Sequence, residues 1–92
     1  MTESFKVVGK AYKYWVNSNG DLHRLDGPAA EWANGTKEWF LNGVLHRVDG
    51  PAIEYLDGQK DWFINGEEFS SQEAWFKALP KECQIDYLFK ME

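Results

Sequence analysis

Short runs of aromatic and β-branched residues, separated by turn-forming pairs, fill the chain up to residue 69. The runs 37–41 and 60–64 are five residues long, which suits strands and is too short for helices. Asn-Gly and Asp-Gly pairs divide the runs, and such pairs favour hairpin turns because both central residues of a type I′ turn need positive φ. The pattern predicts an antiparallel β meander of six or seven short strands over residues 12–69.

The meander is built from an internal repeat. Residues 21–43 and 44–66 align without a gap at an offset of 23 and match at 14 of 23 positions, which in order are Leu, His, Arg, Asp, Gly, Pro, Ala, Glu, Gly, Lys, Trp, Phe, Asn and Gly. Residues 13–20 form an imperfect earlier copy of 37–43 with one extra residue. Region 12–66 therefore holds about two and a half units, which must pack together because one unit cannot bury its own apolar face. We expect a single domain over residues 1–92.

Helical periodicity replaces the strand pattern after residue 69. Ser70 and Ser71 precede an acidic first turn, which is typical of a helix start. Apolar residues then recur at helical spacing on either side of Pro80, at 75, 76 and 79 and again at 85, 88 and 89. The segment 70–92 is therefore predicted to form one or two short helices that cap the last repeat. The fold class is mainly β with a C-terminal α cap.

Composition limits the compartment and the partners. The single Cys83 cannot form an internal disulfide, which favours a reducing compartment. No apolar run is long enough to span a bilayer or to form the core of a signal peptide, so we expect a cytoplasmic location without membrane association. The net charge of −5 argues against direct nucleic-acid binding and suits a partner with a basic surface.

Two segments, 23–29 and 46–52, carry the candidate chemistry. An arginine fork can bond carboxylates or turn carbonyls and hold strands in register, or it can grip an anionic ligand. The candidate binding residues are His23, Arg24, Trp39, His46, Arg47 and Trp62. The residues expected to maintain the repeat are Asp26, Gly27, Pro28, Asp49, Gly50 and Pro51. The histidines and the lone cysteine match no metal-ligand spacing and no catalytic motif is present, so no metal, cofactor or enzymatic activity is predicted.

The same two segments resemble the His-Arg-x-Asp-Gly-Pro-Ala variant of MORN-like repeats, which occurs in small tailed-phage proteins and in some antitoxin-like bacterial proteins. The resemblance covers residues 12–66. It implies a β-hairpin array used for binding, with a phage origin and a location in the host cytoplasm. The leading hypothesis is a non-enzymatic protein that binds and inhibits or sequesters a host macromolecule, in counter-defence or host takeover. The alternative is a protein that sequesters a small anionic ligand such as a nucleotide signal through Arg24, Arg47 and neighbouring Trp rings.

Adjacent aromatic pairs at 14–15, 39–40 and 62–63 predict that both faces of the sheet carry rings, because strand neighbours point to opposite faces. The terminal helices can cover only one face. We expect the other face to meet a protein partner, a second subunit or a flat ligand. A homodimer is the simplest way to bury such a face. The alternative is a monomer whose two helices separate at Pro80 and cover one face each.

Overall fold

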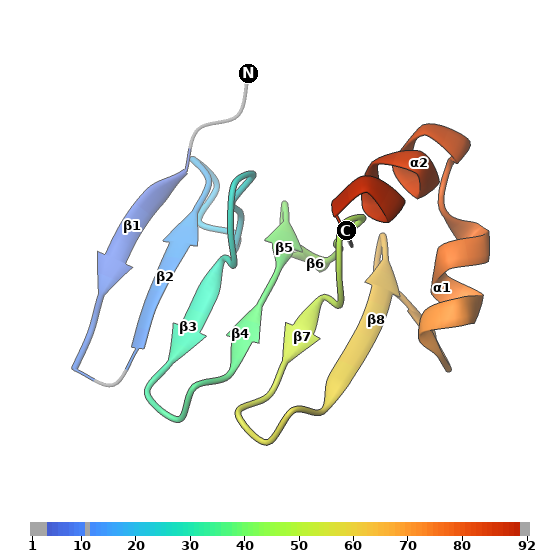
Figure 1. Cartoon of the computed structure of the whole chain (residues 1–92). Coiled ribbons are helices and arrows are strands. Elements are labelled where there is room, and N and C mark those ends of the chain that lie inside the picture. Colours follow the sequence, from blue (N-terminus) through green and yellow to red (C-terminus); the bar gives the residue numbers. More distant parts are fainter. Residues whose placement is uncertain (1–3, 11, 91–92) are drawn as a thin grey trace.

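The computed structural model describes residues 4–10 and 12–90, and its main element is a seven-stranded antiparallel sheet (Figure 1). The strands follow the order β1-β2-β3-β4-β7-β8-β9, with bounds β1 Phe5–Val8, β2 Tyr12–Val16, β3 Ala30–Trp32, β4 Lys37–Glu38, β7 Ile53–Glu54, β8 Lys60–Ile64 and β9 Glu67–Phe69. A separate hairpin pairs β5 (Phe40–Leu41) with β6 (Val44–Leu45). The mainly β meander with a C-terminal helical segment is confirmed. The sheet begins earlier than predicted, because β1 precedes residue 12.

Four of the Asn-Gly and Asp-Gly pairs close hairpins, in two ways. Asn42-Gly43 and Asn65-Gly66 have positive φ at both residues, 49° and 82° in the first pair and 50° and 83° in the second, as type I′ turns require. At Asn34-Gly35 and Asp57-Gly58 only the glycine has positive φ, 93° in each case. These two loops are longer, and each is closed by a glycine N–H that donates to the carbonyl three residues earlier.

Two helices follow the last strand, as predicted. Helix α1 (Gln72–Ala78) is capped by Ser71, whose side chain accepts a hydrogen bond from the Ala74 N–H. Helix α2 (Lys81–Lys90) begins directly after Pro80. Helix α1 packs against β8 and β9, so it covers the end of the repeat array (Figure 1). Neither helix has the length and apolar character that crossing a membrane requires in the described part of the chain.

The apolar stripe of α2 is not buried. Ile85, Leu88 and Phe89 share one side of the helix and are all exposed, Phe89 by 72%. Helix α2 instead turns Tyr87 toward α1, where its ring lies 5.0 Å from that of Trp75. The stripe finds no second layer among the described residues because α2 packs mainly on α1. Gln84 donates to the carbonyls of Phe76 in α1 and of Leu79 directly after it.

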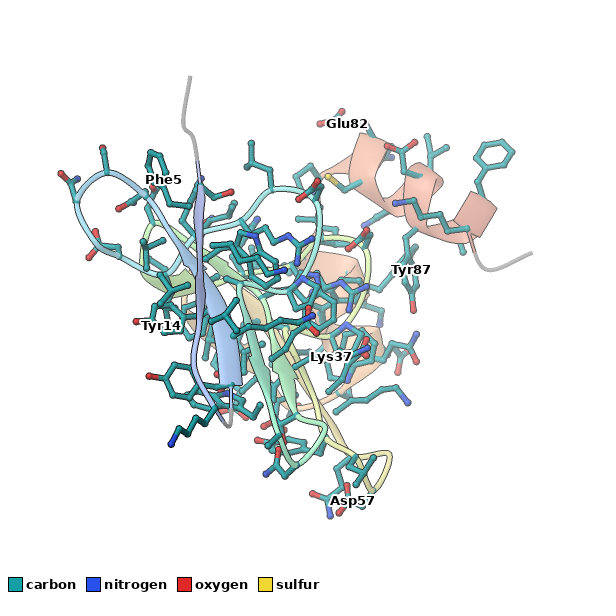
Figure 2. The ribbon with its side chains drawn as sticks, turned by 90° about the vertical axis from the view of Figure 1, so that its left-hand side faces the viewer. Phe5, Tyr14, Lys37, Asp57, Glu82 and Tyr87 are labelled. Atoms are coloured by element: carbon teal, nitrogen blue, oxygen red, sulfur yellow. The ribbon has the colours of Figure 1, made fainter. Side chains whose placement is uncertain are left out.

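Strand alternation and register sort the side chains into two faces. Figure 2 views the sheet from its β1 edge, with Tyr14 on one side and Lys37 on the other, and both helices lie on the Lys37 side. We call that side the clamp face. Its strand positions include Lys6, Lys13, Trp15, Ala29, Glu31, Lys37, Trp39, Ala52, Glu54, Lys60 and Trp62. The opposite side is the acidic–aromatic face. Its strand positions include Phe5, Val7, Tyr12, Tyr14, Ala30, Trp32, Glu38, Ile53, Tyr55, Asp61, Phe63 and Glu68.

Candidate functional site

Each His-Arg-x-Asp-Gly-Pro segment folds around its own arginine. Arg47 donates from Nε to Asp49 at 2.8 Å, and from Nη1 to the Pro51 carbonyl at 3.0 Å and to Glu54 at 2.7 Å. Its guanidinium carbon lies 3.7 Å from the centre of the Trp39 ring. These contacts join the loop before β7 to Glu54 on β7 itself. We call this arrangement an arginine clamp.

The first repeat contains an equivalent clamp. Arg24 donates from Nε to Asp26 and from Nη1 to the Pro28 carbonyl, both at 3.1 Å. Its guanidinium carbon lies 3.7 Å from the centre of the Trp15 ring, and Glu31 approaches Nη1 at 3.7 Å. Because both copies share the bonds to the Asp and to the Pro carbonyl and the stacking on a Trp ring, the clamp belongs to the architecture of the repeat.

A glycine lies close to each guanidinium. A Cβ atom at Gly27 would come within 2.8 Å of the Arg24 Cζ, and one at Gly50 within 2.6 Å of the Arg47 Cζ. Neither glycine has positive φ. The prediction that these Asp-Gly pairs form hairpin turns is therefore wrong. The glycine is used for the close approach of the guanidinium, which a larger residue would obstruct.

In the last unit a tryptophan takes the place of the arginine. The repeat offset would put the next arginine at position 70, where the chain has Ser70. Trp75 from α1 lies on Trp62 instead, with ring centroids 4.7 Å apart. Its Nε1 donates to the Arg47 carbonyl at 3.0 Å. Helix α1 thus completes the stacked row on the clamp face.

Both histidines serve as acceptors for the backbone of the following hairpin. His23, 1% exposed, accepts at Nδ1 from the Asn42 N–H at 2.9 Å. His46 accepts at Nδ1 from the Asn65 N–H, also at 2.9 Å. Each ring thereby supports a type I′ turn. The Nε2 of His23 is buried with no hydrogen-bond partner in the described ranges.

A groove of about 550 Å³ lies between the two arginine loops and α2. Four predicted binding residues line it, namely Arg24, Trp39, His46 and Arg47, whereas His23 and Trp62 do not. Cys83 and three aspartates, Asp26, Asp49 and Asp86, share the lining. No three His, Cys, Asp or Glu side chains within the described ranges are arranged to hold a metal ion.

The charges of this groove are largely paired within the protein. Lys90 donates to Asp49 at 3.0 Å, and the arginine Nε atoms already donate to Asp26 and Asp49. Burial opposes the ionisation of Asp49, but the hydrogen bonds and charges of Arg47 and Lys90 outweigh it and hold the pKa of Asp49 below its usual value. The groove therefore presents little unpaired positive charge to an anionic ligand.

Acidification should weaken the fold through His46. Burial lowers its pKa below the ordinary 6.5, so the unfolded chain binds this proton more readily than the folded one. The free energy of unfolding should fall as the pH drops from about 6.5 through the folded pKa. Urea denaturation at several pH values measures this loss. It is separate from the loss at Asp49, which begins below that group's ordinary 3.8.

The control for this prediction is His46→Asn. The Asn amide oxygen can accept from the Asn65 N–H in place of Nδ1 but does not titrate. The variant should lose part of the pH dependence that begins below about pH 6.5. An unchanged slope in the variant would contradict the assignment to His46.

The acidic–aromatic face carries a cluster of exposed rings. Tyr12 stacks on Tyr14 with centroids 5.4 Å apart and lies 5.6 Å from Trp32. Trp32 is 43% exposed and Tyr55, its counterpart in the next repeat, is 37% exposed. Both helices lie on the other side of the sheet (Figure 2). These rings are therefore open to a partner.

Carboxylates on this face accept hydrogen bonds from aromatic side chains. Glu38 accepts from the Trp32 Nε1 at 2.9 Å, and Asp61 accepts from the Tyr55 hydroxyl at 2.7 Å. That hydrogen bond, burial, and the charges of Asp61, Glu38 and Glu68 raise the pKa of Tyr55. None of these three carboxylates forms an ion pair with a described lysine or arginine.

The clamp face shows the opposite charge pattern. Its carboxylates Glu31 and Glu54 form ion pairs, whereas Glu67 on the edge strand β9 forms none with a described cation. Every lysine in the described strands lies there, at positions 6, 13, 37 and 60. Five of these side chains form one row across neighbouring strands with alternating sign, in the order Lys13, Glu31, Lys37, Glu54, Lys60. The sheet therefore keeps all its strand cations on one face.

Trp32, Glu38, Tyr55 and Asp61 were not among the predicted binding residues. A signal for them exists, because the repeat aligns Trp32 with Tyr55 and Glu38 with Asp61. In both copies the ring and the carboxylate lie six residues apart across a turn. Only the strand register shows that these four side chains share one face of the sheet and that no strand lysine lies on that face.

No family model, curated protein or solved structure matches this chain. The resemblance of the two His-Arg-x-Asp-Gly-Pro-Ala segments to MORN-like repeats therefore stays a prediction from the motif. The geometry of the two sheet faces is the basis on which a function can be assigned.

Proposed function

We propose that the protein is a non-enzymatic binding module whose acidic–aromatic face docks on a basic surface of a protein partner. The observation that supports this most strongly is the division of charge between the faces. Glu38, Asp61 and Glu68 lack ion pairs with described cations, whereas Glu31 and Glu54 in the central strands of the clamp face are paired and only Glu67 on its edge strand β9 is not. Inhibition or sequestration of the partner would follow from covering its basic surface.

The exposed rings complement the carboxylates. Tyr and Trp faces attract lysine and arginine cations, by about 0.5–1 kcal/mol at exposed sites. They also contribute large apolar area with little loss of side-chain freedom, which is why aromatic residues are enriched in protein interfaces. Trp32, Tyr12 and Tyr55 offer such faces next to Glu38 and Asp61. A basic protein surface satisfies both features at once.

The same charges disfavour a second copy as the occupant. Pairing two acidic–aromatic faces would bring Glu38, Asp61 and Glu68 against the same residues with no strand lysine between them. Like charges placed across an interface weaken association. We therefore favour a basic partner over the homodimer expected from the sequence. Sedimentation at micromolar concentration should give a mass near 10.7 kDa.

The proposal predicts selective binding of basic peptides. Titration of the protein with a short lysine-rich synthetic peptide should quench or shift tryptophan fluorescence, and a glutamate-rich peptide should have no effect. The double variant Glu38→Gln/Asp61→Asn should bind the basic peptide about tenfold more weakly, because it loses two charge interactions. Both amides can still accept the hydrogen bonds of Trp32 and Tyr55. Added salt should also weaken binding.

The matched control is Glu73→Gln/Glu82→Gln. It makes the same change in net charge on the two helices, away from the acidic–aromatic face. We expect this variant to bind almost as well as the wild type. Equal loss in both double variants would show that only net charge matters, and binding of the acidic peptide would favour an anion site in the groove. Either result would overturn the proposal.

A further inference from the structure

We propose that the acidic–aromatic face contains two equivalent cation sites, each taking one lysine or arginine side chain, and that the partner presents two such side chains about 10 Å apart. The first site consists of Trp32 and Glu38, and the second of Tyr55 and Asp61. This inference rests on the proposed function and specifies the geometry of the partner.

Each site joins a ring to a carboxylate by a hydrogen bond. The Trp32 indole N–H donates to Glu38 at 2.9 Å, and the Tyr55 hydroxyl donates to Asp61 at 2.7 Å. Each bond holds the carboxylate at the edge of a partly exposed ring. A cation above the ring face can therefore contact the π system and the carboxylate together, which combines a cation–π interaction with an ion pair.

The two sites are copies of each other. Trp32 and Tyr55 are separated by the repeat offset of 23, as are Glu38 and Asp61. The preceding partial unit has no third site. Tyr14 on β2 and Glu38 on β4 both pair with Ala30, which lies on β3 between them. Tyr14 therefore stands in the partial unit where the complete units have a carboxylate. The described sheet thus offers two sites of this composition.

Sheet geometry sets the spacing between the sites. Trp32 lies on β3 and Tyr55 directly follows β7, with only β4 between them. Glu38 and Asp61 lie on β4 and β8, again two strands apart. Neighbouring strands are about 4.8 Å apart, so equivalent atoms of the two sites are separated by about 10 Å.

This spacing restricts how a partner can supply its cations. Side chains seven residues apart on a helix lie on the same side and are separated by about 10 Å. A rigid polyproline II peptide places side chains three residues apart on the same side at about 9 Å and those six apart at about 19 Å. Such peptides can therefore serve as rulers for the two sites.

The test compares two synthetic polyproline peptides of equal composition, each with two lysines, placed three or six residues apart. Isothermal titration calorimetry or tryptophan fluorescence gives both dissociation constants. The wild type should bind the shorter spacing at least about tenfold more tightly, because only that peptide engages both sites at once. Glu38→Gln and Asp61→Asn should each lose this preference, and Glu82→Gln on α2 should keep it.

The outcomes separate this inference from the proposed function. If the wild type binds both peptides equally, or binds only a flexible lysine-rich peptide, the paired sites are wrong and the basic partner stands. If no basic peptide binds, the proposed function fails, and the paired sites fail with it. If both single-substitution variants keep the preference for the shorter spacing, the two lysines bind elsewhere on the protein. That result would also overturn the assignment to Glu38 and Asp61.

Discussion

Trp75→Ala should destabilise the protein by about 3–5 kcal/mol, the range for removing a large buried aromatic side chain. Trp75 is fully buried, and its ring packs between those of Trp62 and Tyr87. Its indole N–H also donates to the Arg47 carbonyl. The substitution would uncover the last repeat and detach the helices from it. Because small domains have about 5–15 kcal/mol of stability, much of the fold's margin should disappear.

Urea denaturation followed by circular dichroism measures this effect. Trp32→Ala is the matched control, since it removes the same side chain from the exposed side of the sheet and should cost about 1 kcal/mol or less. Trp75→Phe should give an intermediate loss, because it keeps a ring but lacks the N–H. Similar losses for Trp75→Ala and Trp32→Ala would contradict the capping role of α1.

Gly50→Ala should destabilise the protein by about 1–3 kcal/mol, and Arg47→Ala should do so by a similar amount. A Cβ at position 50 would come within 2.6 Å of the Arg47 Cζ, so the arginine would have to leave its position. Arg47→Ala removes the hydrogen bonds to Asp49, Pro51 and Glu54 and the stacking of the guanidinium on Trp39. Both substitutions break the same clamp.

The double variant distinguishes this account from two independent defects. With Arg47 already removed, the methyl group that Gly50→Ala introduces meets no guanidinium, so the combined loss should be smaller than the sum by about 0.5–3 kcal/mol. The equivalent pair, Arg24→Ala with Gly27→Ala, should behave in the same way, since the corresponding approach is 2.8 Å. Strictly additive losses in both pairs would show that the glycines do not serve the clamps.

The repeat made much of the fold predictable. Local signals suffice for the turns at Asn42-Gly43 and Asn65-Gly66 and for the helix start at Ser71. The strand β1 escaped prediction because it lies outside the recognisable repeat, and it exists by pairing with β2. The stripe of Ile85, Leu88 and Phe89 indicated a buried side of α2, yet a periodic stripe cannot show whether a second layer is present.

The candidate site was less predictable because it depends on register. The sequence showed that Arg24 and Arg47 recur, but the partners of their guanidiniums became clear only when the loops had closed around them. Whether Glu38 and Asp61 form ion pairs depends on how all the strands of the sheet are aligned. They form none with a described cation, because each strand lysine lies on the opposite face.

Nuclear magnetic resonance of the tryptophan side chains tests the proposed docking face most directly. The Trp32 indole N–H lies on the acidic–aromatic face and bonds to Glu38, whereas the Trp75 indole N–H is buried on the other side and bonds to the Arg47 carbonyl. On addition of the lysine-rich peptide, the Trp32 indole signal should move and the Trp75 signal should stay in place. Movement of the Trp75 signal with an unchanged Trp32 signal would contradict the assignment of the binding face.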